Sequence, residues 1–282
     1  MTVAAAPSVL PPDTRLRPPK RPLPNGTIDC HAHIFDRFDT YPLAEGRKYQ
    51  PPLCTREAWL ALHAALGVSR GVQVHGSPYG FDNSITADFL AEHRKRFAAV
   101  AAIPKNVTTE ELKRLDAAGF KAARLMDQYP SGATTEHLET IAARIAPLGW
   151  HLEINVAKGA DWADLESRVL KCPVPIVIDH LGRIRGGEGI DAPGFKAVRR
   201  LLTSRENVWV KVSSWYRLSD SGHPACDDMR PFVETVLKDR SDRCVWGTNW
   251  PHPGMHDFMP NDIDLVDQLE SWLPSDNVRE PL

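Results

Sequence analysis

Eight short apolar runs recur along the 282-residue chain, and longer amphipathic stretches separate them. Runs of four to six residues that are almost entirely apolar are typical of strands buried on both faces of a parallel sheet. Strict strand–helix alternation, eight times over, predicts a (β/α)8 barrel of the TIM type. The predicted strands are 27–30, 71–74, 98–103, 122–126, 151–156, 175–178, 208–212 and 243–246.

The stretches between these runs carry helix signals at their ends. Thr108 and Thr134 offer N-cap oxygens ahead of acidic residues. Gly67, Gly119 and Gly149 follow helical runs and are typical stop signals. The predicted helices are 56–66, 84–95, 109–118, 135–146, 160–170, 193–203, 227–238 and 262–273. A doubly wound open sheet is the alternative, but no Gly-x-Gly-x-x-Gly follows the first strand.

Composition narrows the class of protein. Charged residues make up 25% of the chain, and the net charge of −2 argues against a nucleic acid or a membrane as the main partner. Five cysteines without a Cys-x-x-Cys pair favour reduced thiols and a cytoplasmic location. We expect an extended, Pro- and Arg-rich arm over residues 1–25 and a single barrel domain over 26–282. Whether the protein forms a homo-oligomer, and whether its C-terminus is trimmed, is left open.

Polar side chains follow nearly every predicted strand, where a parallel barrel carries its chemistry. His31 and His33 are two residues apart and so share one side of the first strand. Arg124, Arg183 and Arg217 are expected at the same mouth, and three guanidinium groups there favour a small anion with two or more carboxylate or sulfonate groups. The other candidates at strand ends or at the mouth are Tyr49, Ser77, Tyr129, Asn155, His180, Asn249 and His252.

Three motifs resemble the amidohydrolase superfamily. They are Asp29-Cys-His-Ala-His33, Val177-Ile-Asp-His-Leu-Gly-Arg183 and Trp246-Gly-Thr-Asn-Trp-Pro-His-Pro253. They are most similar to the branch that contains 2-pyrone-4,6-dicarboxylate lactonase, 4-sulfomuconolactone hydrolase and sugar-acid lactone enzymes. The resemblance covers roughly residue 26 to the end. It implies a distorted (β/α)8 barrel of the amidohydrolase type and water attack on a lactone carbonyl.

The resemblance also implies roles for particular residues. His31, His33 and His180 match histidines that polarise the lactone carbonyl in one relative and help hold zinc in another. The three arginines match groups that grip substrate carboxylates, and Tyr49 and Ser77 match polar residues near the substrate. Asn155 replaces a tyrosine, so a different substrate is expected.

Asn249 stands where the family usually has an aspartate as general base. A carboxylate accepts a proton from water near pH 7, whereas a carboxamide does not. Two interpretations follow: an Asp→Asn change that preserves shape and traps substrate, or a member that works differently, with His180 or His252 as the base.

The residues at the strand ends also indicate which kinds of metal site the chain could form. A two-metal site needs a bridging Lys or Glu on strand 4 and a His on strand 5, and Arg124 and Asn155 are there instead. We therefore expect no cofactor, with a single Zn²⁺ on His31, His33 and His180 as the alternative.

The sequence thus predicts a lactonase, a hydrolase acting on carboxylic ester bonds in aromatic or sugar-acid catabolism. The alternatives are a lactone isomerase, a mononuclear-zinc amidohydrolase or decarboxylase, and an anion-binding protein that has lost its base.

Overall fold

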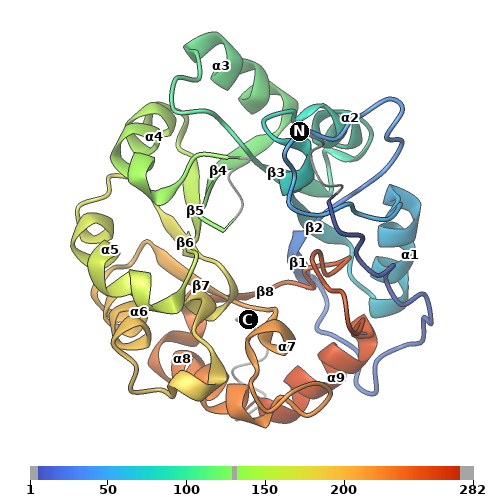
Figure 1. The fold of residues 1–282 in the computed structure, drawn as a ribbon, viewed down its shortest axis with the longest axis vertical. Helices are drawn as coiled ribbons and strands as arrows, with labels where there is room; N and C mark the ends of the chain where they lie inside the picture. Colours follow the sequence, from blue (N-terminus) through green and yellow to red (C-terminus); the bar gives the residue numbers. More distant parts are fainter. Residues whose placement is uncertain (1–5, 129–131, 274–282) are drawn as a thin grey trace.

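A computed structural model describes residues 6–128 and 132–273, which leaves the candidate Tyr129 outside the described residues. Eight parallel strands lie side by side in sequence order and form the inner ring of a barrel (Figure 1). The predicted fold class is confirmed. The strands are β1 (Ile28–Ala32), β2 (Arg70–Val74), β3 (Phe97–Ala101), β4 (Phe120–Met126), β5 (His151–Asn155), β6 (Ile176–Ile178), β7 (Val208–Val212) and β8 (Cys244–Trp246).

Helices between the strands form the outer ring (Figure 1). They are α1 (Arg56–Leu66), α2 (Ser84–His93), α3 (Thr109–Ala118), α4 (Leu138–Ile145), α5 (Trp162–Leu170), α6 (Pro193–Ser204), α7 (Trp215–Leu218), α8 (Arg230–Arg240) and α9 (Asp262–Trp272). The predicted helix caps are confirmed at two positions. Thr108 Oγ1 accepts a hydrogen bond from the Glu111 amide at 3.1 Å, and Gly67 ends α1 with φ 75°. The sequence pattern did not predict α7, which has only four residues and so shows no helical period.

The first and last strands close the barrel just beyond the end of β8. A parallel bridge joins Ala32 to Trp250. The amide of His33 donates to the Trp250 carbonyl at 2.7 Å, and the amide of Asn249 donates to the His31 carbonyl at 2.7 Å. Two predicted site residues therefore lie on the β1 side of this seam, and a third lies on the β8 side.

The buried carboxylate of Asp29 holds the two sides of the seam together. It accepts hydrogen bonds from the amide and hydroxyl of Thr248 at 2.9 and 2.8 Å. Trp59 and His63 of α1 reach the same carboxylate at 3.2 and 3.1 Å. Burial alone raises the pKa of Asp29, but the hydrogen bonds from His63 and Thr248 hold it below its usual value. Asp29 in the first motif is thus an ionised structural residue.

The described part of the N-terminal arm lies along the outside of the barrel. Arg17 pairs with Asp264 and Asp267 of α9 at 2.5 and 2.8 Å. Further towards the N-terminus, the amides of Val9 and Leu10 donate to carbonyls of the loops that follow β1 and β8. The arm therefore braces two loops at the mouth of the barrel. Within the described ranges every helix is too short or too polar to span a bilayer, and all five cysteines are unpaired thiols.

Candidate active site

A pocket opens at the carboxyl ends of the strands. It is lined by His33, Tyr49, Ser77, Arg124, Met126, Gln128, Asn155, His180, Arg183, Arg217, Asn249 and Pro253. All of these except Met126, Gln128 and Pro253 are residues predicted from the sequence. Of the other predicted residues within the described ranges, His31 contacts His33 from outside the lining, and His252 is fully buried and also outside the lining. The barrel thus brings nearly the whole predicted set around one cavity.

The β1 histidines form a contacting pair. The Nε2 atoms of His31 and His33 are 3.2 Å apart, and the centroid of the His180 ring is 4.7 Å from that of His31. His33 Nδ1 faces the Val74 carbonyl at 2.8 Å. Since a carbonyl only accepts, His33 carries its proton on Nδ1 and presents a lone pair at Nε2.

All three site histidines are neutral near pH 7. Burial lowers the pKa of His31 and of His180 well below the usual range. Burial and the nearby Arg124 guanidinium lower the pKa of His33 to about 3. The site therefore offers neutral imidazoles as donors and acceptors.

A buried ionic network lies beneath the histidines. Lys211 of β7 forms an ion pair with Glu153 of β5, and its Nζ is 3.0 Å from His31 Nδ1 and 3.3 Å from Asp179 Oδ1. Arg124 Nε donates to Asp179 Oδ2 at 2.9 Å, and Arg124 Nη2 forms an ion pair with the same oxygen at 2.7 Å. Two cations therefore balance two carboxylates inside the barrel. Although burial raises it, these two cations hold the pKa of Asp179 well below its usual value.

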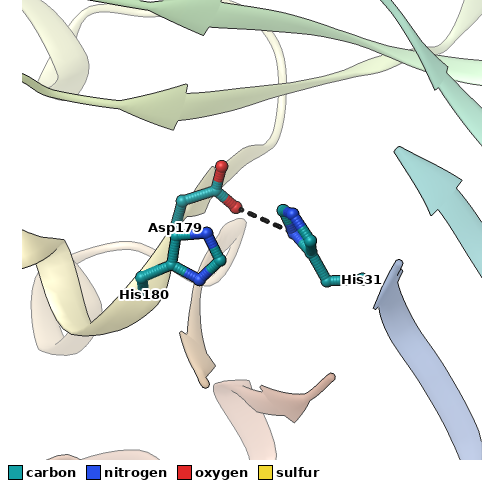
Figure 2. Close-up of side chains that lie close together, drawn as sticks. All are labelled: His31, Asp179 and His180. Carbon is teal, nitrogen blue, oxygen red and sulfur yellow. Dashed lines mark ion pairs between the residues drawn. The ribbon is translucent and has the colours of Figure 1, made fainter. Parts of the chain in front are cut away.

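Three of these side chains are close enough together to share a metal ion. Figure 2 shows the Asp179 carboxylate directed at the His31 ring at 3.6 Å, with His180 beside them. The ligand atoms of the three lie within 4.8 Å of one another.

The surroundings of this triad do not fit a divalent cation. Both Asp179 oxygens face cations, and His31 Nδ1 faces an ammonium that can only donate. Arg124 and Lys211 already balance the two carboxylates, so a divalent ion would add two uncompensated charges to a buried cluster.

The arginines differ in their contacts. Arg124 lies inside β4, with its guanidinium on Asp179, and Arg217 donates to the Pro253 carbonyl. The loop carboxylate of Asp220 pairs with Arg185, which is not part of the pocket lining. Among the described residues that line the pocket there is no carboxylate, so the lining is electropositive.

Asn249 is held by a chain of buried hydrogen bonds. Its Nδ2 donates to the Tyr216 hydroxyl at 2.9 Å, and that hydroxyl lies 2.6 Å from His252 Nδ1. His252 Nε2 in turn lies 3.2 Å from Asp262 Oδ1. Because Nδ2 is used in this way, Oδ1 of Asn249 is the acceptor left for the pocket, and it can orient a water molecule or a hydroxyl group.

His180 has a different anchor. Its Nδ1 lies 2.8 Å from the hydroxyl of the buried Ser213, which follows β7. The His180 backbone has φ 50°, an uncommon conformation for a non-glycine residue. The turn after β6 thus places this ring in the pocket at some conformational cost.

Sequence reasoning missed several residues that support the site. Lys211 and Glu153 each lie within a strand that is otherwise mostly apolar, and a lone charged residue in such a run is the signal available in the sequence. Asp179 stands within a quoted motif, but no role was given to it. Tyr216 left no signal, because it belongs to the unpredicted α7.

Comparison with known proteins agrees with this geometry. The 4-sulfomuconolactone hydrolase of Hydrogenophaga intermedia is 34% identical, over 98% of this chain and 92% of its own length. The 2-pyrone-4,6-dicarbaxylate hydrolase of Comamonas testosteroni is 33% identical, over 94% and 89%. The D-galactarolactone isomerase of Agrobacterium fabrum is 29% identical, over 93% and 89%. The family model described as Amidohydrolase matches residues 28–282, and the chain belongs to this family.

Proposed function

We propose that the protein is a hydrolase that opens the lactone ring of a small anionic compound. The observation that carries this proposal is one electropositive pocket containing neutral imidazoles, a carboxamide and three guanidinium groups. Relatives at 33–34% identity are named hydrolases of a sulfonated and of a dicarboxylated lactone, which fits the charge of this pocket. The compound class is therefore a lactone with carboxylate or sulfonate groups.

The residues divide the reaction among them. Arg183 and Arg217 bind the anionic groups, while the Arg124 guanidinium lies against the carbonyl oxygen and stabilises its developing charge. The His31–His33 pair supports the pocket wall beside it. Oδ1 of Asn249 accepts a hydrogen bond from the attacking water. His180 takes the water proton as the carbon–oxygen bond forms and returns it to the ring oxygen as the ring bond breaks. The product is a carboxylate with a free hydroxyl group.

A screen of lactone acids in ¹⁸O-enriched water tests this proposal. Hydrolysis places one ¹⁸O atom in the product carboxylate, which mass spectrometry detects. Absence of both turnover and label across carboxylated and sulfonated lactones contradicts the proposal. Thermal shifts by the same compounds without turnover favour the anion-binding alternative.

The Asn249→Asp variant tests the role of the carboxamide. If Asn249 is a degenerate base, a carboxylate there raises turnover, by about 100-fold for an effective general base. Lack of any gain on the same panel shows that the natural reaction does not use a carboxylate at this position. Asn83→Asp, at a buried asparagine outside the pocket lining, serves as the control for the substitution itself.

A lactone isomerase is the second candidate, and the absence of a carboxylate from the described pocket lining favours it. A hydroxyl group of the substrate is held next to the carbonyl at a high effective concentration, so it needs less activation than water. The isomerase relative gives this candidate a precedent within the family. Isomerisation yields a rearranged lactone without ¹⁸O, so the same experiment separates the two activities.

We further propose that turnover needs no metal, because Arg124 and Lys211 already balance the buried carboxylates. A chelator is expected to leave the rate unchanged. Loss of activity with chelator, restored by Zn²⁺, supports a zinc amidohydrolase or decarboxylase instead.

A further inference from the structure

Lys211 is surrounded by three acceptors, one from β1, one from β5 and one from the residue that follows β6. Its ammonium faces the Glu153 carboxylate, His31 Nδ1 at 3.0 Å and Asp179 Oδ1 at 3.3 Å. An ammonium has only N–H donors and no acceptor, so Lys211 donates to Glu153 and to His31, while Asp179 is its ion-pair partner. The side chain is only 2% exposed, and Lys211 does not belong to the pocket lining.

This contact fixes where His31 carries its proton. Because Lys211 can only donate, His31 Nδ1 must accept, and the single proton of the ring then lies on Nε2. Nε2–H points at His33 Nε2, 3.2 Å away, where the contact of His33 with Val74 leaves a lone pair. The hydrogen bonds therefore run in one direction, from Lys211 through His31 and His33 to the Val74 carbonyl.

We propose that Lys211 is a positioning residue that holds His31 in the Nε2–H tautomer, so that this N–H donates to His33 Nε2 and fixes the orientation of the His33 ring in the pocket lining. The proposal rests on the proposed function for its kinetic consequence. Its structural content, the tautomer, stands without that function.

A purely electrostatic role for Lys211 makes a different prediction. If it served only to balance Glu153, removing both charges together would leave His31 and the reaction unchanged. If Lys211 sets the tautomer, the double change loses that control, because Nδ1 of His31 then has no obligatory donor. The Lys211→Met/Glu153→Gln double variant separates these roles. It also avoids the unpaired buried carboxylate that the Lys211→Met single variant would leave.

Long-range ¹H–¹⁵N NMR of the histidine rings is the direct test, with His31 assigned from the His31→Asn spectrum. Wild-type protein is expected to show His31 with its proton on Nε2. The double variant is expected to show a mixture or the Nδ1–H form. The exposed Lys121→Met variant, at a lysine paired with Asp116, should match wild type.

Kinetics on a lactone turned over by the wild type give the second readout. The double variant should lose at least about tenfold in kcat, as supporting partners of catalytic groups typically do, with KM changed less than about twofold. A wild-type His31 protonated on Nδ1, or a double variant that keeps both tautomer and kcat, overturns the proposal. If no lactone is turned over, the function fails, and the NMR spectra still decide the tautomer.

Discussion

The amide of Asn249 ends a chain of hydrogen bonds that runs through Tyr216 to His252, whose Nε2 lies 3.2 Å from the buried carboxylate of Asp262. The Asp262 carboxylate faces His252 Nε2 and favours the ring proton there, so His252 Nδ1 accepts from the Tyr216 hydroxyl while the Tyr216 oxygen accepts from Asn249 Nδ2. His252 then carries its own proton on Nε2, facing Asp262. The direction of this chain suits a carboxamide, since a carboxylate at position 249 would have to accept from Tyr216 instead.

Tyr216→Phe is expected to lower turnover by about tenfold, because the Asn249 amide loses the partner that fixes its orientation. It should also cost about 1–3 kcal/mol in free energy of unfolding, since His252 Nδ1 becomes a buried acceptor without a donor. Steady-state kinetics and urea unfolding measure the two effects. Tyr41→Phe removes a comparable hydroxyl contact, with Asp88 at 2.8 Å away from the pocket, and should keep wild-type turnover. Equal turnover in both variants would contradict the role given to Tyr216.

Individual site residues were predictable where their chemistry was visible in the local sequence. His31, His33 and His180 stand in or just after strand-like runs, so a barrel fold alone was enough to bring them to one mouth. The role of Lys211 was not predictable from the sequence. It depends on Glu153, which is 58 positions away, and on which face of each strand points inward. Pairing across a barrel interior is a tertiary property that a run of residues does not show.

At the scale of elements, β1 and the turn after β8 approach each other closely at Gly247. A Cβ atom at Gly247 would lie 2.7 Å from both the backbone nitrogen and the Cβ of His31. These are parts of rigid strands, so the contact cannot be relieved by rotating a side chain. Glycine at this position therefore sets the distance between the edges that carry His31 and Asn249.

Gly247→Ala is expected to cost about 1–3 kcal/mol in free energy of unfolding through overpacking, and to reduce turnover by displacing His31. Gly67→Ala provides a matched loss of stability, since Gly67 has φ 75° at the end of α1 and L residues there cost about 1–2 kcal/mol. Its turnover should stay at the wild-type level. If Gly247→Ala unfolds more easily but turns over normally, the close approach matters for stability alone.

Element boundaries were predicted correctly where capping residues or the spacing of apolar residues marked them. They were missed where tertiary contacts determine the end of an element. Residues 56–66 and 109–118 form helices as expected, between N-cap threonines and glycine stops. The predicted helix 135–146 instead begins as a 3-10 turn, and α4 covers only Leu138–Ile145. Strand β1 extends beyond the predicted 27–30 to Ala32, because pairing with β2 and the seam continues past the apolar run.

For the whole molecule, the buried neutral histidines link stability to pH. Burial lowers the pKa of His33 to about 3 and that of His75 to about 4, and it lowers the pKa values of His31 and His180 well below the usual range. In the unfolded chain these rings bind protons below about pH 6.5, while in the folded protein they stay neutral. The unfolded state therefore gains protons first on acidification.

We expect the free energy of unfolding to fall as pH drops from 6.5 towards 4.5, by up to about 1.4 kcal/mol per pH unit for each such histidine. Urea unfolding across this range measures the slope. The His33→Gln variant removes one of these groups and should show a shallower slope. A slope that is unchanged in His33→Gln would contradict the assignment of His33 as a neutral buried ring.

The barrel joins its first and last strands by a short bridge and one buried carboxylate. His31 and Asn249 lie on opposite sides of this junction. Native fluctuations that part the join, well short of global unfolding, would separate His31 from Asn249 while most of the sheet stays paired. Hydrogen–deuterium exchange at the amides of His33 and Asn249 would report such openings. Mild denaturant would then inactivate the protein before its circular dichroism signal is lost, because catalysis depends on the junction between the first and last strands, where one isolated bridge links the two ends of the sheet.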